Sequence, residues 1–333
     1  MNIKTGTVEK SSPVYDFIAR HIAGKAHMSD HPRLEVTRLK GSHEVYLVTD
    51  MKEHQSVILK SFYRPGVHRS RLVRNMDREY DRLKYVNRIG VAGSNYRSVR
   101  PLGRSHEMLF FIEEHIRGRP FSDYIKDALV HNEYDRLYDK ITLLAGYLSK
   151  LHKKTMTGHR ANAHTVKKEM ERYLYQSNLT GRVDPWKQSC IQHMADRWQS
   201  LPLIKDAMSA LTHGDATPSN FLFKHDKLYV IDFERSGCRD PVYDLGMVSG
   251  ELAHFAMAYT SDPYRADPFI GHLYWMYAGN FKDQYGEFLS LTRRNPFYMA
   301  NCLIRISRNP EHSREYKDRL IYHAMECLKS IER

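Results

Sequence analysis

The segment HGDATPSNFLFKHDKLYVIDFE, residues 213–234, carries the most informative pattern in the chain. Its first half places an aspartate and an asparagine, Asp215 and Asn220, on one loop. Its second half, FLF and LYVID around the polar turn KHDK, is typical of a β-hairpin. Because a hairpin folds the chain back on itself, we expect the aspartate at its far end, Asp232, to return to the loop.

Two carboxylates and one amide suit phosphoryl transfer from a nucleotide. One carboxylate orients or deprotonates the attacking hydroxyl, and hard oxygen ligands hold Mg²⁺ against the β- and γ-phosphates. The reaction depends mostly on rigid positioning and charge neutralisation, which a short loop and a hairpin provide.

The pattern HGDxxxxN followed by IDFE resembles the catalytic loop and metal-binding segment of the aminoglycoside phosphotransferase and choline kinase family, small-molecule relatives of the protein kinases. The resemblance implies an α+β, protein-kinase-like bilobal fold, with a small antiparallel-sheet N-lobe that carries one helix and a larger, mostly helical C-lobe. It also implies that Asp215 is the catalytic base, that Asn220 and Asp232 bind the metal, and that ATP and Mg²⁺ are the cofactors.

Two charged residues upstream fit the same family. Lys60 ends the apolar run VILK, and the family pairs the lysine of its third strand with the ATP phosphates. Glu79 lies on the apolar stripe of a helix predicted over 70–87, where unpaired burial of a carboxylate is costly. The family's Lys–Glu ion pair makes Lys60 its expected partner. A surface lysine and a glutamate that reaches water remain the simpler alternatives.

Other nucleotide contacts are assigned by the resemblance alone. Gly41 and Ser42 lie between two predicted strands, where protein kinases cover the phosphates with several glycines, although a lone glycine is usually an ordinary turn. The backbone of Glu114 to Ile116, within FFIEEHIRGRPF, is expected to meet adenine at the passage between the lobes.

The motif DPVYDLG, residues 240–246, resembles the family's DxxxDLG element, and this implies that Asp244 braces the catalytic loop. Two departures from the protein kinases stand out. Glu234 replaces the glycine of DFG and either assists the metal or points to solvent. Ala-Thr-Pro follows Asp215, without the lysine that many protein kinases place two residues after their catalytic aspartate.

The pattern along the chain predicts three segments: an N-terminal helical extension at 1–29, a nucleotide-binding N-lobe at 30–116, and a catalytic and acceptor-binding C-lobe at 117–333. Residues 155–210 are polar, helical in places and harder to place, and they are a candidate wall for the acceptor pocket.

Alternation of apolar and polar residues predicts strands in the N-lobe, and helical spacing of apolar residues predicts helices elsewhere. Strands are expected at 34–50 around a turn, in the stretch that ends at Lys60, and at 98–102 and 108–114. Helices are expected at 13–25, 70–87, 138–153 and 315–331.

The interval between Asp232 and Asp244 leaves little room for the activation segment with which protein kinases dock a peptide. It favours a small-molecule acceptor, such as a sugar, an amino alcohol, an aminoglycoside-like compound or a nucleoside. Candidate acids for a cationic acceptor are Glu251, Asp262 and Asp267. An atypical, RIO-like protein serine kinase and a non-catalytic nucleotide-binding pseudokinase are the alternatives, but the complete set of catalytic residues argues against the second.

Composition limits the remaining classes. The net charge of +12 favours an anionic or neutral partner over a polycation, but lysine and arginine are spread along the chain, so nucleic acid is not an expected partner. The four cysteines form no CxxC pair, and no stretch has the about 20 apolar residues of a membrane span. We therefore expect a cytoplasmic protein. The oligomeric state and the choice of ATP over GTP do not follow from the sequence.

Overall fold

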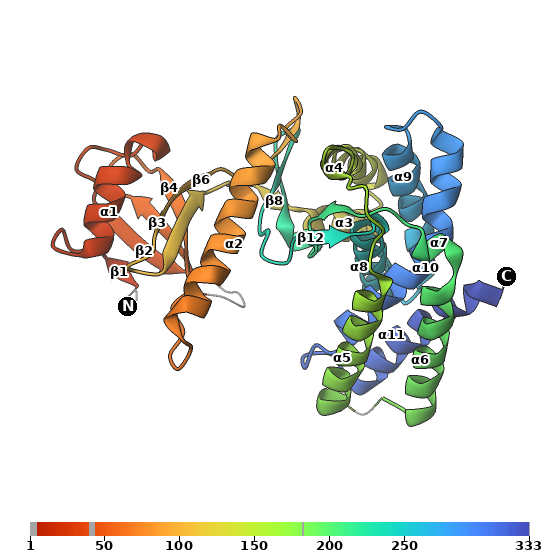
Figure 1. Ribbon diagram of the computed structural model, residues 1–333. Helices are drawn as coiled ribbons and strands as arrows, with labels where there is room; N and C mark the ends of the chain where they lie inside the picture. The colour runs from red at the N-terminus through yellow and green to blue at the C-terminus, as the bar shows by residue number, and fades with distance from the viewer. Residues whose placement is uncertain (1–4, 40–43, 182, 333) are drawn as a thin grey trace. The chain divides into compact units, whose positions relative to one another are not determined.

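The computed structural model describes residues 5–39, 44–181 and 183–332, which form two compact units. Unit 1 contains the described residues up to Ala92, together with Arg97–Gly118 and Tyr229–Glu234. Unit 2 contains Gly93–Tyr96, Arg119–Leu228 and the described residues from Arg235 onward. Figure 1 labels the elements of both units.

Unit 1 is built on a six-stranded sheet in which each pair of neighbouring strands is antiparallel. In spatial order its strands are β1 (Gly6–Thr7), β2 (Leu34–Arg38), β3 (Glu44–Asp50), β4 (Ser56–Ser61), β7 (Phe110–Glu114) and β6 (Pro101–Ser105). The strands predicted on either side of the turn near residue 41, before Lys60 and at 108–114 are confirmed. The strand predicted at 98–102 is not continuous. Its first residue belongs to β5 (Tyr96–Ser98), and its last two residues belong to β6, which begins at Pro101.

The two faces of this sheet are covered by different helices. Val57 and Leu59 of β4 belong to the same buried cluster as Val14 and Ile18 of α1 (Pro13–His21). Because side chains alternate along a strand, Lys60 lies on the opposite face, where α2 (Arg69–Arg88) packs. The helix predicted at 13–25 ends early, at His21, and a 3₁₀ turn, η1 (Gly24–Ala26), follows it. The start of the chain therefore shares its core with the sheet.

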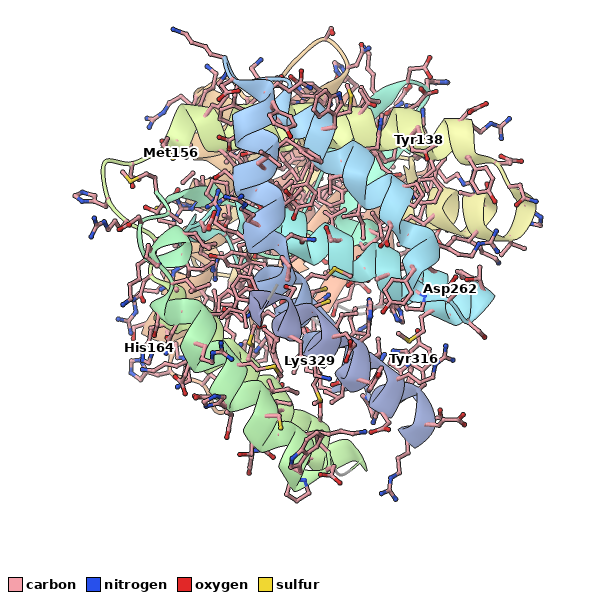
Figure 2. The ribbon with its side chains drawn as sticks, turned by 90° about the vertical axis from the view of Figure 1, so that its right-hand side faces the viewer. Tyr138, Met156, His164, Asp262, Tyr316 and Lys329 are labelled. Carbon is pink, nitrogen blue, oxygen red and sulfur yellow. The ribbon has the colours of Figure 1, made fainter. Side chains whose placement is uncertain are left out.

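Unit 2 is mostly helical. Its helices are α3 (Phe121–His131), α4 (Tyr134–Thr155), α5 (Ala163–Gly181), α6 (Pro185–Ser200), α7 (Pro202–Lys205), α8 (Val242–Thr260), α9 (Asp267–Ala278), α10 (Gln284–Ser307) and α11 (Arg314–Lys329), with the 3₁₀ turns η2 (Pro218–Asn220), η3 (Pro263–Ala266) and η4 (Ser330–Glu332). The helices predicted at 138–153 and 315–331 are confirmed as α4 and α11. In Figure 2, α11 extends from Tyr316 to Lys329 and packs beside α6.

Short strands surround the loop that carries Asp215. Strand β9 (Ala210–Thr212) pairs antiparallel with β12 (Gly237–Arg239), and β8 (Arg119–Pro120) pairs antiparallel with β10 (Phe221–Lys224). As predicted, FLF lies in β10, and LYV lies in β11 (Lys227–Val230); Ile231 and Asp232 follow the end of β11. The loop with Asp215 and Asn220 is thus fixed between β9 and β10.

Helices α8 and α10 pack closely because α8 carries a glycine at their contact. A Cβ atom on Gly246 would lie 2.3 Å from the Cβ of Tyr298, a distance that real side chains do not reach. The two helices therefore share one packed core, in which the side chain of Asp244 of α8 is fully buried. No helix within the described residues is long and apolar enough to cross a lipid bilayer.

Candidate active site

The loop that carries Asp215 is anchored by a buried aspartate in unit 2. The Oδ2 atom of Asp244 accepts a hydrogen bond from the backbone N–H of His213 at 2.6 Å, and its Oδ1 accepts one from Gly214 at 2.9 Å. Nε2 of His152 donates to Oδ2 at 3.1 Å. Burial alone would raise the pKa of Asp244, but the hydrogen bond and charge of His152 and the amide of Gly214 outweigh burial and lower it. The bracing role expected of Asp244 is confirmed.

The turn before Asp215 requires glycine. Gly214 has a φ of +80°, a backbone conformation that side-chain-bearing residues rarely adopt. A Cβ atom at this position would also lie 2.1 Å from the carbonyl oxygen of Arg235. The glycine of the HGD motif therefore lets the segment after Asp232 pass close beneath the loop.

Asp215 and Asn220 are joined within the loop. The Nδ2 atom of Asn220 donates to the backbone carbonyl of Asp215 at 2.8 Å, and both side chains are largely buried. Oδ1 of Asp215 accepts no hydrogen bond from any residue that the structure describes, although a buried acceptor ordinarily has a donor. Two arginines lie nearby, with Nη1 of Arg305 3.6 Å from Oδ1 and Nε of Arg235 3.7 Å from Oδ2. The carboxylate is thus held between two arginines, with one oxygen that accepts no hydrogen bond from the described residues.

A cavity of about 750 Å³ opens beside Asp215 within unit 2. Its wall includes Gln176 and Leu179 of α5, so part of the 155–210 segment lies where an acceptor pocket is expected. Glu251 of α8 also lines it, but the other two candidate acids do not. Asp262 lines a separate cavity of about 390 Å³, and Asp267 is exposed at the start of α9.

In unit 1, Lys60 stands at the centre of a group of carboxylates. Its Nζ atom lies 2.8 Å from Oε1 of Glu79, 3.5 Å from Oε1 of Glu113 and 3.6 Å from Oδ1 of Asp232. The predicted ion pair between Lys60 and Glu79 is therefore present, and Glu79 is buried and does not reach water. The register explains Glu113: it lies opposite Ile58, on the same face of the sheet as Lys60.

The charges in this cluster do not balance. Burial would lower the pKa of Lys60, but the carboxylates of Glu113, Glu79 and Asp232 raise it well above its ordinary value. Burial, with Glu79 and Asp232 nearby, raises the pKa of Glu113 to about 7 despite the opposing charge of Lys60. Its Oε2 atom is buried without a hydrogen-bond partner among the described residues. One lysine thus faces more negative charge than it neutralises.

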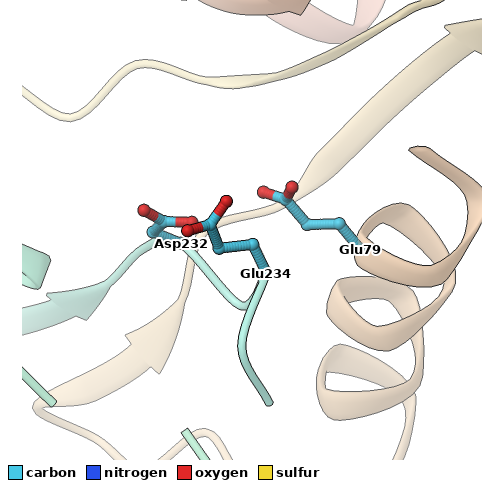
Figure 3. A group of neighbouring side chains, drawn as sticks. All are labelled: Glu79, Asp232 and Glu234. Atoms are coloured by element: carbon cyan, nitrogen blue, oxygen red, sulfur yellow. The ribbon is translucent and has the colours of Figure 1, made fainter. Parts of the chain in front are cut away.

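A candidate metal site adjoins the lysine. Carboxylate oxygens of Glu79, Asp232 and Glu234 lie within 4.8 Å of one another, and Figure 3 shows the three side chains pointing toward a shared space. Asp232 adopts a positive φ of 64°, so the backbone itself is bent at this residue. Hard divalent cations prefer such oxygen ligands. Glu234 therefore points toward Asp232, which favours the metal-assisting alternative.

The remaining nucleotide contacts expected from the sequence are placed only in part. The carboxylate of Glu114 accepts hydrogen bonds from Arg97 and Arg100, and its backbone N–H donates to the carbonyl of Arg100 at 3.0 Å. The carbonyl of Ile116 accepts from Gly118 at 2.9 Å. A contact of this backbone with adenine stays a prediction. Gly41 and Ser42 lie outside the described residues.

Two residues at these sites escaped the sequence interpretation, Glu113 and Arg305. The run FFIEE did contain a signal. Period-two alternation places Glu113 on the same face of the sheet as Phe111, and Phe111 pairs with Lys60 on the neighbouring strand. Arg305 interrupts the apolar run CLIRIS on α10, and a buried arginine needs acidic partners. Nothing local in the sequence identifies those partners as Asp215 and Glu251.

Among solved structures, choline kinase of Cryptosporidium parvum Iowa II is similar to this chain with a TM-score of 0.66 and 13% identity, over 96% of this chain and 95% of that one. An ethanolamine kinase of Plasmodium vivax is similar with a TM-score of 0.56 and 16% identity, over 97% of this chain and 88% of that one. Choline kinase LicA of Streptococcus pneumoniae is similar with a TM-score of 0.55 and 16% identity, over 96% of this chain and all of that one. At these identities the similarity shows the fold, and the expected α+β, kinase-like fold is confirmed.

In sequence, the chain is 37% identical to protein LicA of Haemophilus influenzae over 59 residues, which is 18% of this chain and 17% of that protein. The match thus spans less than a fifth of the length of this relative. The model of the phosphotransferase enzyme family matches much more, residues 35–269, and this range includes Lys60, Asp215 and Asp232. The chain therefore belongs to the phosphotransferase enzyme family.

Proposed function

We propose that the protein is an ATP-dependent phosphotransferase that moves the γ-phosphate to a hydroxyl group of a small molecule. The observation that carries this proposal is the position of Asp215 in the wall of a cavity of about 750 Å³, with a buried oxygen that accepts no hydrogen bond from the described residues. An acceptor hydroxyl in the cavity would donate to this carboxylate, which acts as the general base.

The carboxylate cluster around Lys60 suits a nucleotide with a divalent cation. Its excess negative charge is costly when buried, and a cation bound by Asp232 offsets it. When bound, ATP with Mg²⁺ supplies the phosphoryl group and a neutralised triphosphate. In this proposal Lys60 binds the phosphates and Glu79 orients Lys60.

The other assigned residues complete the proposed nucleotide site. Asn220 and Asp232 are both proposed to bind the magnesium ion, and Gly41 and Ser42 are proposed to contact the phosphates. The backbone of Glu114 and Ile116 binds the base. A cytoplasmic location, where ATP and Mg²⁺ are both plentiful, is part of the proposal.

The chain between Asp232 and α8 supports a small acceptor over a peptide. It forms β12, paired with β9, and then reaches Asp240, whose carboxylate accepts hydrogen bonds from Arg294 at 2.6 Å and Tyr298 at 2.9 Å. These contacts tie the segment down immediately before α8. Among the described residues from 233 to 241, no extended stretch is left to dock a protein substrate.

The test is transfer of radiolabelled γ-phosphate from ATP to a panel of alcohols, sugars, amino alcohols and nucleosides, with casein as a protein control. The wild-type protein is compared with Asp215→Asn, and Asp226→Asn, at a side chain that is 96% exposed, is the matched control. We expect the control to retain transfer, and Asp215→Asn to lose it by at least about a thousandfold while still binding ATP. Transfer to casein alone would favour a protein kinase. Mg²⁺-dependent ATP binding without any transfer by the wild type would favour a pseudokinase.

A further inference from the structure

The cavity beside Asp215 has walls that discriminate between classes of acceptor. Within unit 2 its walls come from the start of α3, α5, the loop with Asp215, α8, the end of α10 and the segment that follows α10. A volume of about 750 Å³ is typical of a site for a small organic molecule. The charges and rings in its walls therefore bear on what the proposed phosphotransferase accepts.

The acids in this wall are already neutralised by the protein. The lining residues include two carboxylates, Asp215 and Glu251. Arg305 forms an ion pair with Glu251 and lies 3.6 Å from Asp215. Burial raises the pKa of Glu251, and the charge of Arg305 only partly opposes that shift. Neither carboxylate is thus left to balance a positive charge on the acceptor.

Basic side chains line the same wall. Arg308 lines the cavity and donates to Gln176 at 3.1 Å. Burial, together with the charges of Arg305, Arg235 and Arg172, lowers the pKa of Arg308. Burial also lowers the pKa of two imidazoles that line the cavity, that of His254 to about 4, and positive neighbours add to both shifts. Three basic groups on two elements thus lie in surroundings that resist further positive charge.

The wall of this cavity has few of the aromatic side chains that bind a quaternary ammonium group. Such groups bind against several aromatic faces, usually with a carboxylate nearby. Phe255 is the single phenylalanine, tyrosine or tryptophan among the described residues that line the cavity. Tyr134, Tyr138 and Phe269 gather around the separate, smaller cavity.

We infer that the acceptor carries a carboxylate or phosphate group, bound at Arg308, in addition to the hydroxyl that faces Asp215. This inference rests on the proposed phosphotransferase activity and specifies its substrate class. An arginine next to the pocket suits both anions, because its guanidinium forms bidentate, charge-assisted hydrogen bonds with either. A hydroxy acid, a sugar acid and a sugar-alcohol phosphate share this chemistry.

The test uses matched probes that differ in charge: glycerol, glycerate and glycerol 3-phosphate, then glucose and gluconate, with choline as the cationic probe. Calorimetry measures binding to the full-length protein, and transfer of radiolabelled phosphate is measured on the same compounds. We expect each anionic probe to bind at least about tenfold more tightly than its uncharged partner, as one charge-assisted hydrogen bond implies. Glycerate and glycerol 3-phosphate distinguish the carboxylate from the phosphate.

Substitutions of Arg308 test whether this residue binds the anionic group of the probes. Arg308→Gln is expected to weaken binding of the anionic probes by about tenfold and to leave the uncharged probes and ATP unchanged, and Arg308→Lys is expected to restore part of the loss. Arg293→Gln, at an exposed position on α10, the helix that Arg308 directly follows, is the control. Thermal melting checks that each variant is folded.

The two proposals fail in different ways. Tight binding of an anionic probe without transfer would support the acceptor class and contradict the phosphotransferase activity. Binding of choline or an uncharged probe at least as tightly as the anions, or an Arg308→Gln variant without effect, would overturn the acceptor class. Transfer to choline or glycerol in that case would leave the proposed activity intact.

Discussion

Asp244 and His152 form a hydrogen bond of 3.1 Å in a place where neither side chain is exposed to solvent. The other ring nitrogen of His152 lies 3.0 Å from the hydroxyl oxygen of Tyr277 on α9. The carboxylate therefore links three helices, α4, α8 and α9, to the two backbone amides that precede Asp215. The catalytic loop is held by the helical core and not by its own short sequence.

Asp244→Asn tests this anchoring. The amide would turn an N–H group toward donors that now meet a carboxylate, so we expect the free energy of unfolding to fall by about 3 kcal/mol. Because folding lowers the pKa of Asp244, its contribution is complete at neutral pH and is lost only as the pH falls below the ordinary value of 3.8. Urea unfolding at pH 7 measures the change. Unchanged stability, beside an unchanged Asp226→Asn control, would contradict the anchoring role.

Gly214→Ala tests the close approach beneath the loop. A methyl group 2.1 Å from the carbonyl oxygen of Arg235 must displace backbone, and a positive φ adds strain. We expect a loss of about 2 kcal/mol in unfolding free energy and at least about a hundredfold loss in kcat, since Asp215 shifts with the turn.

The matched control is Gly271→Ala on α9, where an added Cβ meets no atom within 4 Å. Alanine is the better helix former, so this variant should be as stable as the wild type or more stable by up to about 1 kcal/mol. Equal effects of the two substitutions would contradict the steric explanation.

The loop and the first sheet could be predicted because their signals are local. Motif spacing identified Asp215 and Asn220, and the apolar run VILK, with its β-branched residues, identified the strand that carries Lys60. Residues 155–210 were expected to be helical only in places, and the bounds of α5, α6 and α7 were not predicted, because long polar stretches blur their apolar stripes. Helix α6, for example, buries only Ile191, Met194, Ala195 and Trp198 among its described side chains.

The charge pairing at the sites could not be predicted from local patterns. Glu251 was a candidate acid for a cationic acceptor, but its neutralisation by Arg305 joins residues on separate helices. Such a pair depends on the packing of α8 against α10, which in turn depends on the glycine contact at Tyr298. The spacing of residues along the sequence does not reveal this contact between two helices.

Lys60→Met tests the carboxylate cluster. Removal of the cation leaves Glu79 and Glu113 buried with uncompensated charge, so we expect about 3 kcal/mol of destabilisation and a KM for ATP raised by at least about tenfold. Lys84→Met, at an exposed position on α2, is the control. Addition of Glu113→Gln to Lys60→Met should recover part of the stability, because it removes one of the unpaired charges. A double variant no more stable than Lys60→Met would argue against that coupling.

The last prediction concerns pH and His254. Burial first, then the charges of His312 and Arg305, lower the pKa of this imidazole from 6.5 to about 4 in the folded protein. A lowered pKa means that the unfolded chain takes up a proton first as the pH falls, so the stabilising contribution is complete above pH 6.5 and is lost between pH 6.5 and about 4.

Replacement of His254 by asparagine keeps a polar group near Tyr316 and removes the titration. The wild type should lose up to about 3 kcal/mol more than the variant over this pH range, measured by urea unfolding at intervals between pH 7 and pH 4. His193→Asn, at an exposed position on α6, should follow the wild type. Parallel curves for His254→Asn and the wild type would mean that the imidazole is not held neutral by its surroundings, and the inference of an anionic acceptor would lose one of its supports.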